Sequence, residues 1–176
     1  AKLILRAFLL LVIGLSLTIV PAFAITSPIN TMNVELSSDE THSGTFHIGD
    51  SGNGKLLVKS GTILSLDTLV LGSANATGEI EVETGATLNV NTLIDMDQGQ
   101  GSVKIRGAAT IKQVDFITDK DATFKVFNNA TARVETLRKH ENNTLSMGAT
   151  ATLRCQEIQI GDSAELEWSR GILSAH

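Results

Sequence analysis

An internal repeat of about 21 to 24 residues constrains this chain more than any other feature of its sequence. The segment GKLLVKSGTILSLDTLVLG, which begins at Gly54, aligns with GEIEVETGATLNVNTLID, which begins at Gly78. Further units follow at similar spacings, and their first apolar positions are Val103, Phe124 and Leu145. Units this small cannot bury their own apolar face, so successive units must stack on one another to form a core.

Within each unit, apolar residues alternate with polar ones in short runs, which is the period of a β-strand and not of a helix. We expect three short strands per unit, with Gly61, Gly85 and Asn129 at the first bend, where a positive φ is least costly. The sequence therefore predicts an all-β fold, a single-stranded parallel β-helix (β-solenoid) of about five to six coils. Five complete coils, from Gly54 to Ser163, would form a rod of roughly 25 Å at about 4.8 Å per coil.

Extending these spacings through whole units predicts which residues share a position in successive coils. The spacing between the second unit and the third aligns Ile111 with Leu88 on the second strand. The third strand would then present Val70, Ile94 and Ile117 at one outward position, where they would form an apolar stripe. We expect this stripe to be a protein interface, unless the segment that precedes the solenoid folds back and covers it.

Outward positions of the first strand carry charges of alternating sign from coil to coil. Lys55 is expected next to Glu79, and Glu81 next to Lys104. Lys59, Glu83 and Arg106 are expected at one position of three successive coils. Neighbouring charges of opposite sign are what parallel, in-register coils require, although each exposed pair contributes only about 0.2 to 1 kcal/mol.

Residues 1–24 have the order of a secretory signal peptide: a basic start, a long apolar run, and small residues at Ala22 and Ala24. We expect cleavage before Ile25. A retained membrane anchor is the alternative, but the uncharged run is shorter than the roughly 20 residues that a spanning helix needs. The expected protein is therefore secreted or on the cell surface, with no stable membrane span once the leader is removed.

The leader and the repeat together suggest a division of the chain into three parts. Residues 1–24 form the signal peptide, residues 25–45 a polar N-terminal segment or loose cap, and residues 46–176 the solenoid. The single cysteine, Cys155, cannot form an internal disulfide, and it falls at a position held by Leu66 and Val90 in earlier coils. We therefore expect it to be a small core residue.

Units of the form G-x-L-x-V-x-x-G-x-x-L-x-V-x-x-L, with a glycine-rich bend, resemble the short repeats of autotransporter passenger domains and related exported repeat proteins. The resemblance extends from Phe46 to about Trp168. It implies a right-handed parallel β-helix, or a similar β-solenoid, exposed outside the cell.

Charge and residue types argue against several classes of function. The net charge of −5 is the wrong sign for a nucleic-acid footprint, so we expect no nucleic-acid partner. The four histidines have no recurrent spacing, and the residues 49–54 (GDSGNG) fit a turn better than a calcium loop, so no metal or other cofactor is expected.

Enzymatic activity is not expected either. A glycosidase needs a carboxyl group that can act as a general acid. Glu79, Glu81 and Glu83 are neighbours of lysine and arginine, which would hold these carboxylates ionised.

The function that these features favour is an exported structural or adhesive surface element, with self-association or other surface proteins as its partners. Such a protein could assemble into filaments through its coil ends or its apolar stripe. The alternative is a carbohydrate-binding or carbohydrate-cleaving β-helix that uses the outward face of its coils as an extended groove, with glycans as partners. Such grooves usually depend on aromatic side chains, but Trp168 is the only tryptophan and tyrosine is absent. A cytoskeletal β-helix of the bactofilin kind is a third candidate, which the leader argues against.

Overall fold

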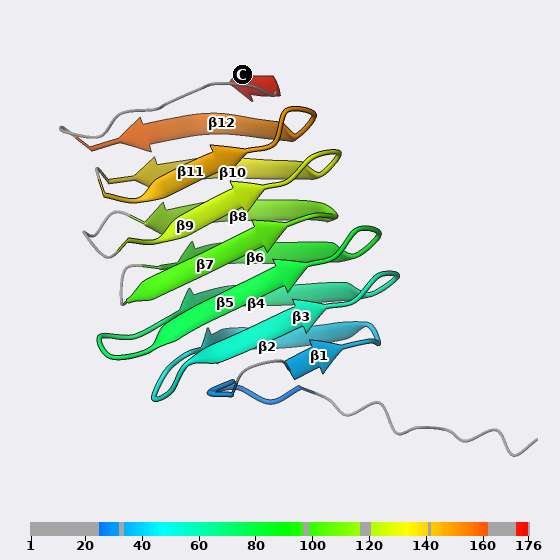
Figure 1. Ribbon diagram of the computed structural model, residues 1–176, viewed down its shortest axis with the longest axis vertical. Helices are drawn as coiled ribbons and strands as arrows, with labels where there is room; N and C mark the ends of the chain where they lie inside the picture. Colours follow the sequence, from blue (N-terminus) through cyan, green and yellow to red (C-terminus); the bar gives the residue numbers. More distant parts are fainter. Residues whose placement is uncertain are drawn as a thin grey trace, which may run out of the picture.

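The chain folds into a parallel β-solenoid, whose coils stack along the long axis of the molecule (Figure 1). The computed structural model describes residues 25–31, 34–96, 99–116, 121–140, 142–161 and 172–175. Within these ranges there is no helix, and every pairing between named strands is parallel. The predicted all-β solenoid is confirmed.

Each coil contributes one short strand to one sheet and one long strand to the other. The short strands are β1 (Val34–Leu36), β3 (Gly54–Val58), β5 (Thr77–Val82), β7 (Gln100–Ile105), β9 (Thr123–Val126) and β11 (Thr144–Met147). The other sheet contains β2 (Glu40–Ile48), β4 (Ile63–Leu71), β6 (Thr87–Asp95), β8 (Ala108–Phe116), β10 (Thr131–Lys139), β12 (Thr152–Ile160) and the short terminal strand β13 (Ile172–Ala175). We call these the short sheet and the long sheet.

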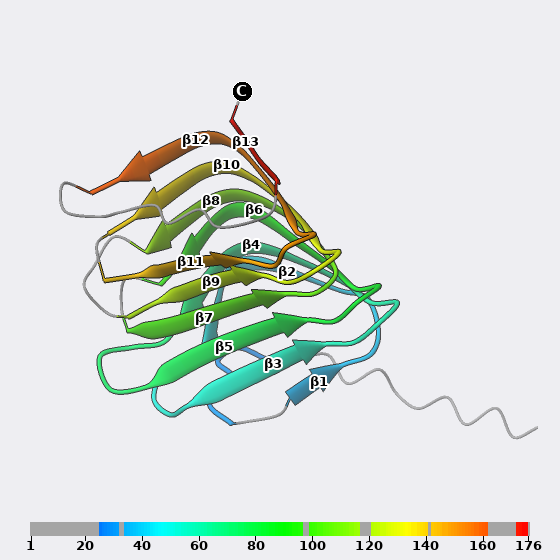
Figure 2. The ribbon, with the colours of Figure 1, turned by 45° about the horizontal axis from the view of Figure 1, so that its top comes forward.

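The second and third strands expected in each coil are joined into one long strand, which arches around the core (Figure 2). The arch is visible in the alternation of buried and outward residues. In β10, Val134 and Leu137 are both buried, and the two residues between them, Glu135 and Thr136, face outward in succession. This break in the period of two turns the strand at a corner while its backbone pairing continues.

Apolar side chains fill the space between the two sheets in columns, one residue per coil. Leu56, Ile80, Val103 and Phe124 form one such column, each with 0% of its surface exposed. A coil pairs with the coils above and below it, so most of the apolar burial arises between units that are one repeat apart in sequence.

The repeat spacing predicted for the first strand of each coil is confirmed by the strand register. Leu56 pairs with Ile80, Ile80 with Val103, Val103 with Phe124, and Phe124 with Leu145. The first bends are also as predicted, because Gly61, Gly85 and Asn129 have φ values of 82°, 83° and 63°.

On the long sheet, the predicted alignment of the third coil is wrong by two positions. Leu88 pairs with Ala109 instead of Ile111, and Ile111 pairs with Val90. The cause is the turn before the strand: β5 and β6 are separated by residues 83–86, whereas β7 and β8 are separated only by Arg106 and Gly107. Because this turn is two residues shorter, β8 begins two positions earlier than the repeat spacing predicts.

The solenoid also begins earlier than residue 46, which corrects the expected boundary of a separate N-terminal segment. Val34 in β1 pairs with Leu56, and Glu40 in β2 pairs with Leu64. Ile25 and Ile29, which precede these strands, are only 8% and 4% exposed and belong to the core. Residues 25–45 therefore contribute strands and core residues to the first coil.

The first coil carries polar residues at two positions that are apolar in the next coil. Glu40 and His42 stand opposite Leu64 and Leu66, which are buried. The His42 Nε2 atom lies 3.7 Å from a Glu40 carboxylate oxygen. Inward-pointing polar and charged residues on a terminal strand make its edge a poor template for pairing with another chain.

Candidate binding groove on the long sheet

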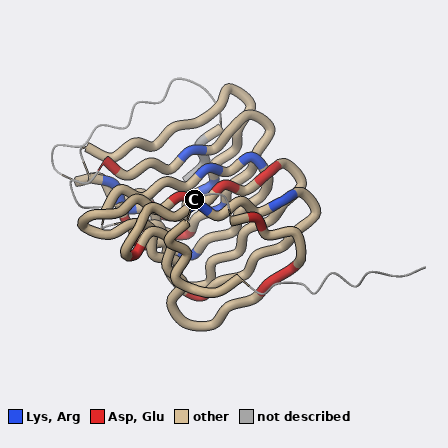
Figure 3. Tube along the Cα trace, turned by 60° about the horizontal axis from the view of Figure 1, so that its bottom comes forward, with Lys and Arg blue, Asp and Glu red and all other residues tan. Residues whose placement is uncertain are grey.

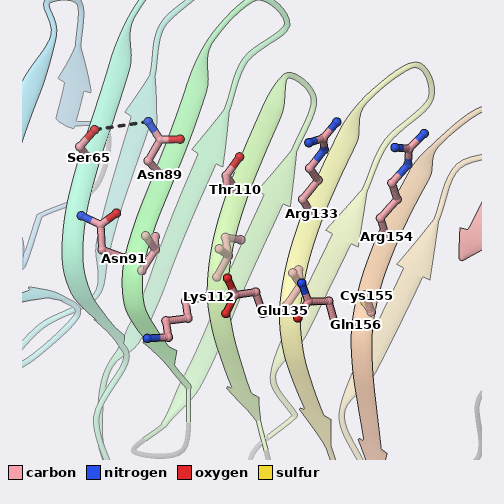
Figure 4. Close-up of a pocket in the computed structure, with 13 residues that line it drawn as sticks. Ser65, Asn89, Asn91, Thr110, Lys112, Arg133, Glu135, Arg154, Cys155 and Gln156 are labelled. Atoms are coloured by element: carbon pink, nitrogen blue, oxygen red, sulfur yellow. Dashed lines mark hydrogen bonds between the residues drawn. The ribbon is translucent and has the colours of Figure 1, made fainter. Parts of the chain in front are cut away.

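A groove of about 580 Å³ crosses the outer face of the long sheet (Figure 4). It passes over five consecutive strands, β4, β6, β8, β10 and β12. Its lining consists of Ser65, Asn89, Val90, Asn91, Thr110, Ile111, Lys112, Arg133, Val134, Glu135, Arg154, Cys155 and Gln156. Because alternate residues of a strand face outward and the coils are in register, the groove is a repeated position of the coil and follows the solenoid axis.

Two rows of polar side chains border the groove. In the first row, Ser65 pairs with Asn89, Asn89 with Thr110, Thr110 with Arg133, and Arg133 with Arg154. The Asn89 Nδ2 atom donates a hydrogen bond to Ser65 Oγ at 3.4 Å, as Figure 4 shows. Neighbouring members of a row therefore stand about one strand spacing, about 4.8 Å, apart.

The second row lies two positions further along each strand and consists of Asn91, Lys112, Glu135 and Gln156. The groove thus changes in character along its length. On β4 and β6 it carries hydroxyl and amide groups, and on β8, β10 and β12 it adds three cations, Lys112, Arg133 and Arg154, and one carboxylate, Glu135. Its lining includes no aromatic side chain.

The cations of the groove have no acidic partner among the residues that the structure describes. Arg133, Arg154 and Lys112 are exposed, and none of them has a described carboxylate oxygen within 4.0 Å, not even that of Glu135. Arg133 and Arg154 stand directly opposite one another on adjacent strands. Like charges in this position destabilise a sheet.

The outer face of the short sheet shows the opposite arrangement, and it confirms the predicted ladder of opposite charges. Basic and acidic residues lie on neighbouring strands of the stack (Figure 3). The ion pairs are Lys55 with Glu79 at 2.7 Å and with Glu81 at 3.0 Å, Lys59 with Glu83 at 2.8 Å, Lys104 with Glu79 at 2.6 Å, and Arg106 with Glu81 at 2.7 Å. Two ion pairs differ from the predicted ones: Arg106 pairs with Glu81 and not with Glu83, and Lys104 pairs with Glu79 although Glu81 is its strand partner. The Arg106 guanidinium also lies 3.7 Å from the centre of the Phe127 ring.

These contacts change the pKa values of the paired groups. Burial by itself would raise the pKa of Glu79, but hydrogen bonds from Lys104 and Lys55 outweigh burial, and the pKa is lowered. The pKa of Glu81 is lowered in the same way, because hydrogen bonds from Arg106 and Lys55 outweigh its burial. The hydrogen bond to Glu79 raises the pKa of Lys55. Glu79 and Glu81 are therefore held ionised at neutral pH, which is unsuitable for a general acid.

The ladder predicts a loss of stability in acid. A carboxyl group with a lowered pKa in the folded state stabilises the fold above its ordinary pKa of 4.5, and this stabilisation is lost as the pH falls through the folded value. Glu79 and Glu81 together should contribute about 1 kcal/mol, or about 2 to 4 °C in the unfolding temperature. Thermal unfolding followed by circular dichroism at pH 6 and pH 3 measures this loss.

A variant with Glu79→Gln and Glu81→Gln should show a flatter dependence on pH between these two values, because neither residue can then be protonated. Glu157→Gln, on the exposed part of β12, is the matched control and should keep the full dependence. An unchanged acid loss in the double variant would show that the ladder does not cause it.

The predicted apolar stripe of Val70, Ile94 and Ile117 is not an outward surface, and this prediction is wrong. Ile94 is 0% exposed and pairs with the buried Leu69, whereas Val70 pairs with Asp95. The register of β4 and β6 shifts between Leu66 and Thr68, so the positions after this point are offset by one from the repeat spacing. A shift of one position moves a side chain to the opposite face of the sheet. Ile117 lies outside the described residues.

Cys155 lies in the core, as its repeat position predicts. It is 2% exposed and pairs with Val134. Burial raises the pKa of its thiol to about 11, so the thiol is protonated at neutral pH.

The other predicted positions are only partly covered by the structure. Ala22 and Ala24, on the N-terminal side of the predicted cleavage point, lie outside the described residues, and Ile25 is the first residue described. In the described ranges no group of three or more His, Cys, Asp or Glu side chains is placed to hold a metal ion. These ranges also contain no helix with the length and apolar character needed to cross a membrane.

An extended groove on the outward face of the coils belongs to the carbohydrate alternative, but its residues were not predicted from the sequence. The signal that could have revealed it is the pair of arginines one repeat apart, at positions 133 and 154, where other coils carry small polar residues. The two-position error in the third coil misplaces only that coil's member of the row, because it puts Lys112 instead of Thr110 between Asn89 and Arg133.

Comparison with known proteins adds no relative to this geometry. Neither the family models, nor the curated proteins, nor the solved structures include a match to this chain. The features that bear on function are therefore the residues of the groove, the ion-pair ladder and the coil ends.

Proposed function

We propose that this chain is an exported structural or adhesive element that acts outside the cell or at its surface. Residues 1–24 support the export part of the proposal, because they have the order of a signal peptide. The resemblance to the repeats of autotransporter passenger domains supports the same location. The solenoid supports the structural part, because parallel coils in continuous register form a rod with an extended side surface.

The observation that carries the adhesive role is the groove over five consecutive strands. A globular domain usually offers a compact pocket, whereas this groove repeats one position of the coil along the rod. A surface of this shape fits an extended partner that lies along the axis and contacts several coils at once.

Assembly into filaments is a second form of this proposal, and the coil ends bear on it. The stripe that would have joined rods side by side is absent, because Ile94 is buried. At the N-terminal end, Glu40 and His42 occupy positions that would have to be covered by the next rod. These side chains point toward the interior of the coil, and a stacked coil would complete the burial of the Glu40 carboxylate, so we favour separate rods over end-to-end filaments.

Electron microscopy of the purified protein, together with its mass in solution, tests this choice. We expect discrete particles with the mass of one chain. Regular filaments would show that the coil ends stack in spite of Glu40 and His42, and would favour the structural polymer. Detection of the protein on the surface of intact producing cells by a specific antibody tests the location, and its retention inside the cells would contradict export.

Carbohydrate binding is a second candidate function, and the lining of the groove favours it. Asn89, Asn91 and Gln156 offer amide donors and acceptors, while Ser65 and Thr110 offer hydroxyl groups. These are suitable partners for the hydroxyl groups of a sugar chain. Since no aromatic side chain lines the groove, recognition would depend on hydrogen bonds and charge in place of stacking.

A further inference from the structure

We propose that the cationic part of the groove, over β8, β10 and β12, binds the acidic groups of an extended polysaccharide, with Arg133 and Arg154 as the main anion contacts. This inference rests on the second candidate function, carbohydrate binding, and specifies the class of glycan.

The two arginines of the groove lie next to each other on the sheet. Arg133 and Arg154 are exposed and stand opposite one another on adjacent strands, where the strand spacing is about 4.8 Å. Like charges in this arrangement repel each other. Lys112, on the next strand, adds a third cation to the same groove.

Most cations on the outer faces of the two sheets, in contrast, have an acidic partner. On the short sheet, Lys55, Lys59, Lys104 and Arg106 are each within 3.0 Å of a carboxylate oxygen. The exception on the short sheet is Lys125, which stands opposite Lys104 and lies 4.7 Å from the centre of the Phe127 ring. On the long sheet, Arg138 lies 3.4 Å from a carboxylate oxygen of Asp115. None of the described carboxylates pairs with Lys112, Arg133 or Arg154. An anion from a ligand would supply the missing negative charge.

The neutral residues of the groove indicate which kind of anion fits it. The groove combines cations with amides and hydroxyls, so a ligand that carries both acidic groups and hydroxyl groups fits its whole length. A sugar residue in an extended chain is close in length to one strand spacing, so successive sugars can meet successive coils. Carboxylate and sulfate groups share the chemistry that arginine recognises.

The residues of the groove favour a sugar chain over a nucleic acid as the ligand. The chain has a net charge of −5, and Glu135 lies within the groove beside the cations. These negative charges act against every polyanion and do not by themselves separate a nucleic acid from an acidic polysaccharide. However, the groove lacks the aromatic side chains on which single-stranded bases stack.

The experiment measures binding of the full chain to defined oligosaccharides by isothermal titration calorimetry at low and at physiological salt. The probes are an oligogalacturonate, which carries carboxylates, and a heparin oligosaccharide, which carries sulfates. Fully methyl-esterified oligogalacturonate is the neutral control for the first probe, and polyglutamate is the control for a polyanion without sugar. We expect the acidic oligosaccharides to bind, with the stronger of the two identifying the acidic group, and salt to weaken the binding.

Three variants assign the contact to the groove. Arg133→Gln with Arg154→Gln should weaken binding of the acidic probe about tenfold or more. Lys59→Gln with Lys125→Gln makes the same change in net charge away from the groove, and should bind as the original chain does. Glu135→Gln should bind more tightly, because it removes a repulsive charge, and a merely misfolded variant could not show this gain.

The possible failures are distinguishable. Equal binding of the neutral and acidic oligosaccharides would overturn the acidic-glycan assignment while leaving carbohydrate binding in place. Equal binding of polyglutamate would overturn recognition of a glycan, and no binding to any probe would overturn both. An unchanged affinity in the arginine variant, with circular dichroism showing an intact fold, would remove the proposed contact from the groove.

Discussion

Replacing Ile94 by lysine is expected to prevent stable folding. Ile94 is 0% exposed and belongs to the continuous core between the two sheets. The substitution removes a buried apolar side chain and places an ammonium group where the neighbouring residues offer it no water. We expect a loss on the order of 4 to 5 kcal/mol, which is comparable with the whole stability of many domains. Urea unfolding followed by circular dichroism, or the soluble yield of the variant, measures this effect.

Val70→Lys is the matched control, because the same residue type is introduced at the position that the sequence grouped with Ile94. Val70 is partly exposed, and it pairs with Asp95 on the next strand. A lysine there can reach solvent and stand near a carboxylate, so a change of less than about 1 kcal/mol is expected. If Val70→Lys unfolded the protein and Ile94→Lys did not, the register of β4 and β6 would be incorrect.

The second large effect is expected from Gly78→Ala. Gly78 pairs with Gly54 at the start of the short strands, where the backbones of adjacent turns approach closely. A Cβ atom at Gly78 would overlap the Ile48 carbonyl oxygen and the Gly72 amide nitrogen, and it would lie 2.9 Å from the Cα atom of Leu71. These are backbone atoms of neighbouring turns, so the coils themselves must move apart. We expect a loss of roughly 3 kcal/mol or more, measured by urea unfolding.

Gly61 provides the control for this prediction, because the cost of a side chain there comes from the backbone conformation and not from a steric overlap. A Cβ atom there would have no atom within 4 Å, but Gly61 has a φ of 82°. Gly61→Ala should therefore cost about 1 to 2 kcal/mol. Gly61→Asn should cost less, since Asn129 adopts a φ of 63° at the corresponding bend. A loss for Gly78→Ala no larger than that for Gly61→Ala would contradict the close approach of the turns.

The fold was predictable because the repeat encodes it many times. Each coil supplies its own alternation of apolar and polar residues, and the charges at Lys55, Glu79 and Lys104 agree independently with parallel, in-register stacking. The bent strand was less accessible. A coil of three short strands and a coil of one short strand and one arched strand show the same alternation of apolar and polar residues. They differ only at a corner, such as the one at Glu135 and Thr136.

The positions around the groove were less predictable, because they depend on turn lengths. A turn that is shorter by two positions before β8 changes every later pairing of the third coil, and a single-position shift in β6 buries Ile94. Both changes are small compared with the repeat, and either turn length is compatible with the same strand pattern. A groove made of one residue per coil can be recognised in a sequence only after every coil has been aligned correctly.

The repeated coil also determines how such a molecule can evolve by gaining or losing repeats. Since each coil pairs only with its neighbours, a block of about 21 to 24 residues can be duplicated or deleted without a new topology. Every added block would lengthen the groove by about 4.8 Å and add one side chain to each of its rows. The length of ligand that the groove can bind is therefore proportional to the number of coils. The charge that each new coil adds depends on its residue at the position that Arg133 and Arg154 occupy in their coils.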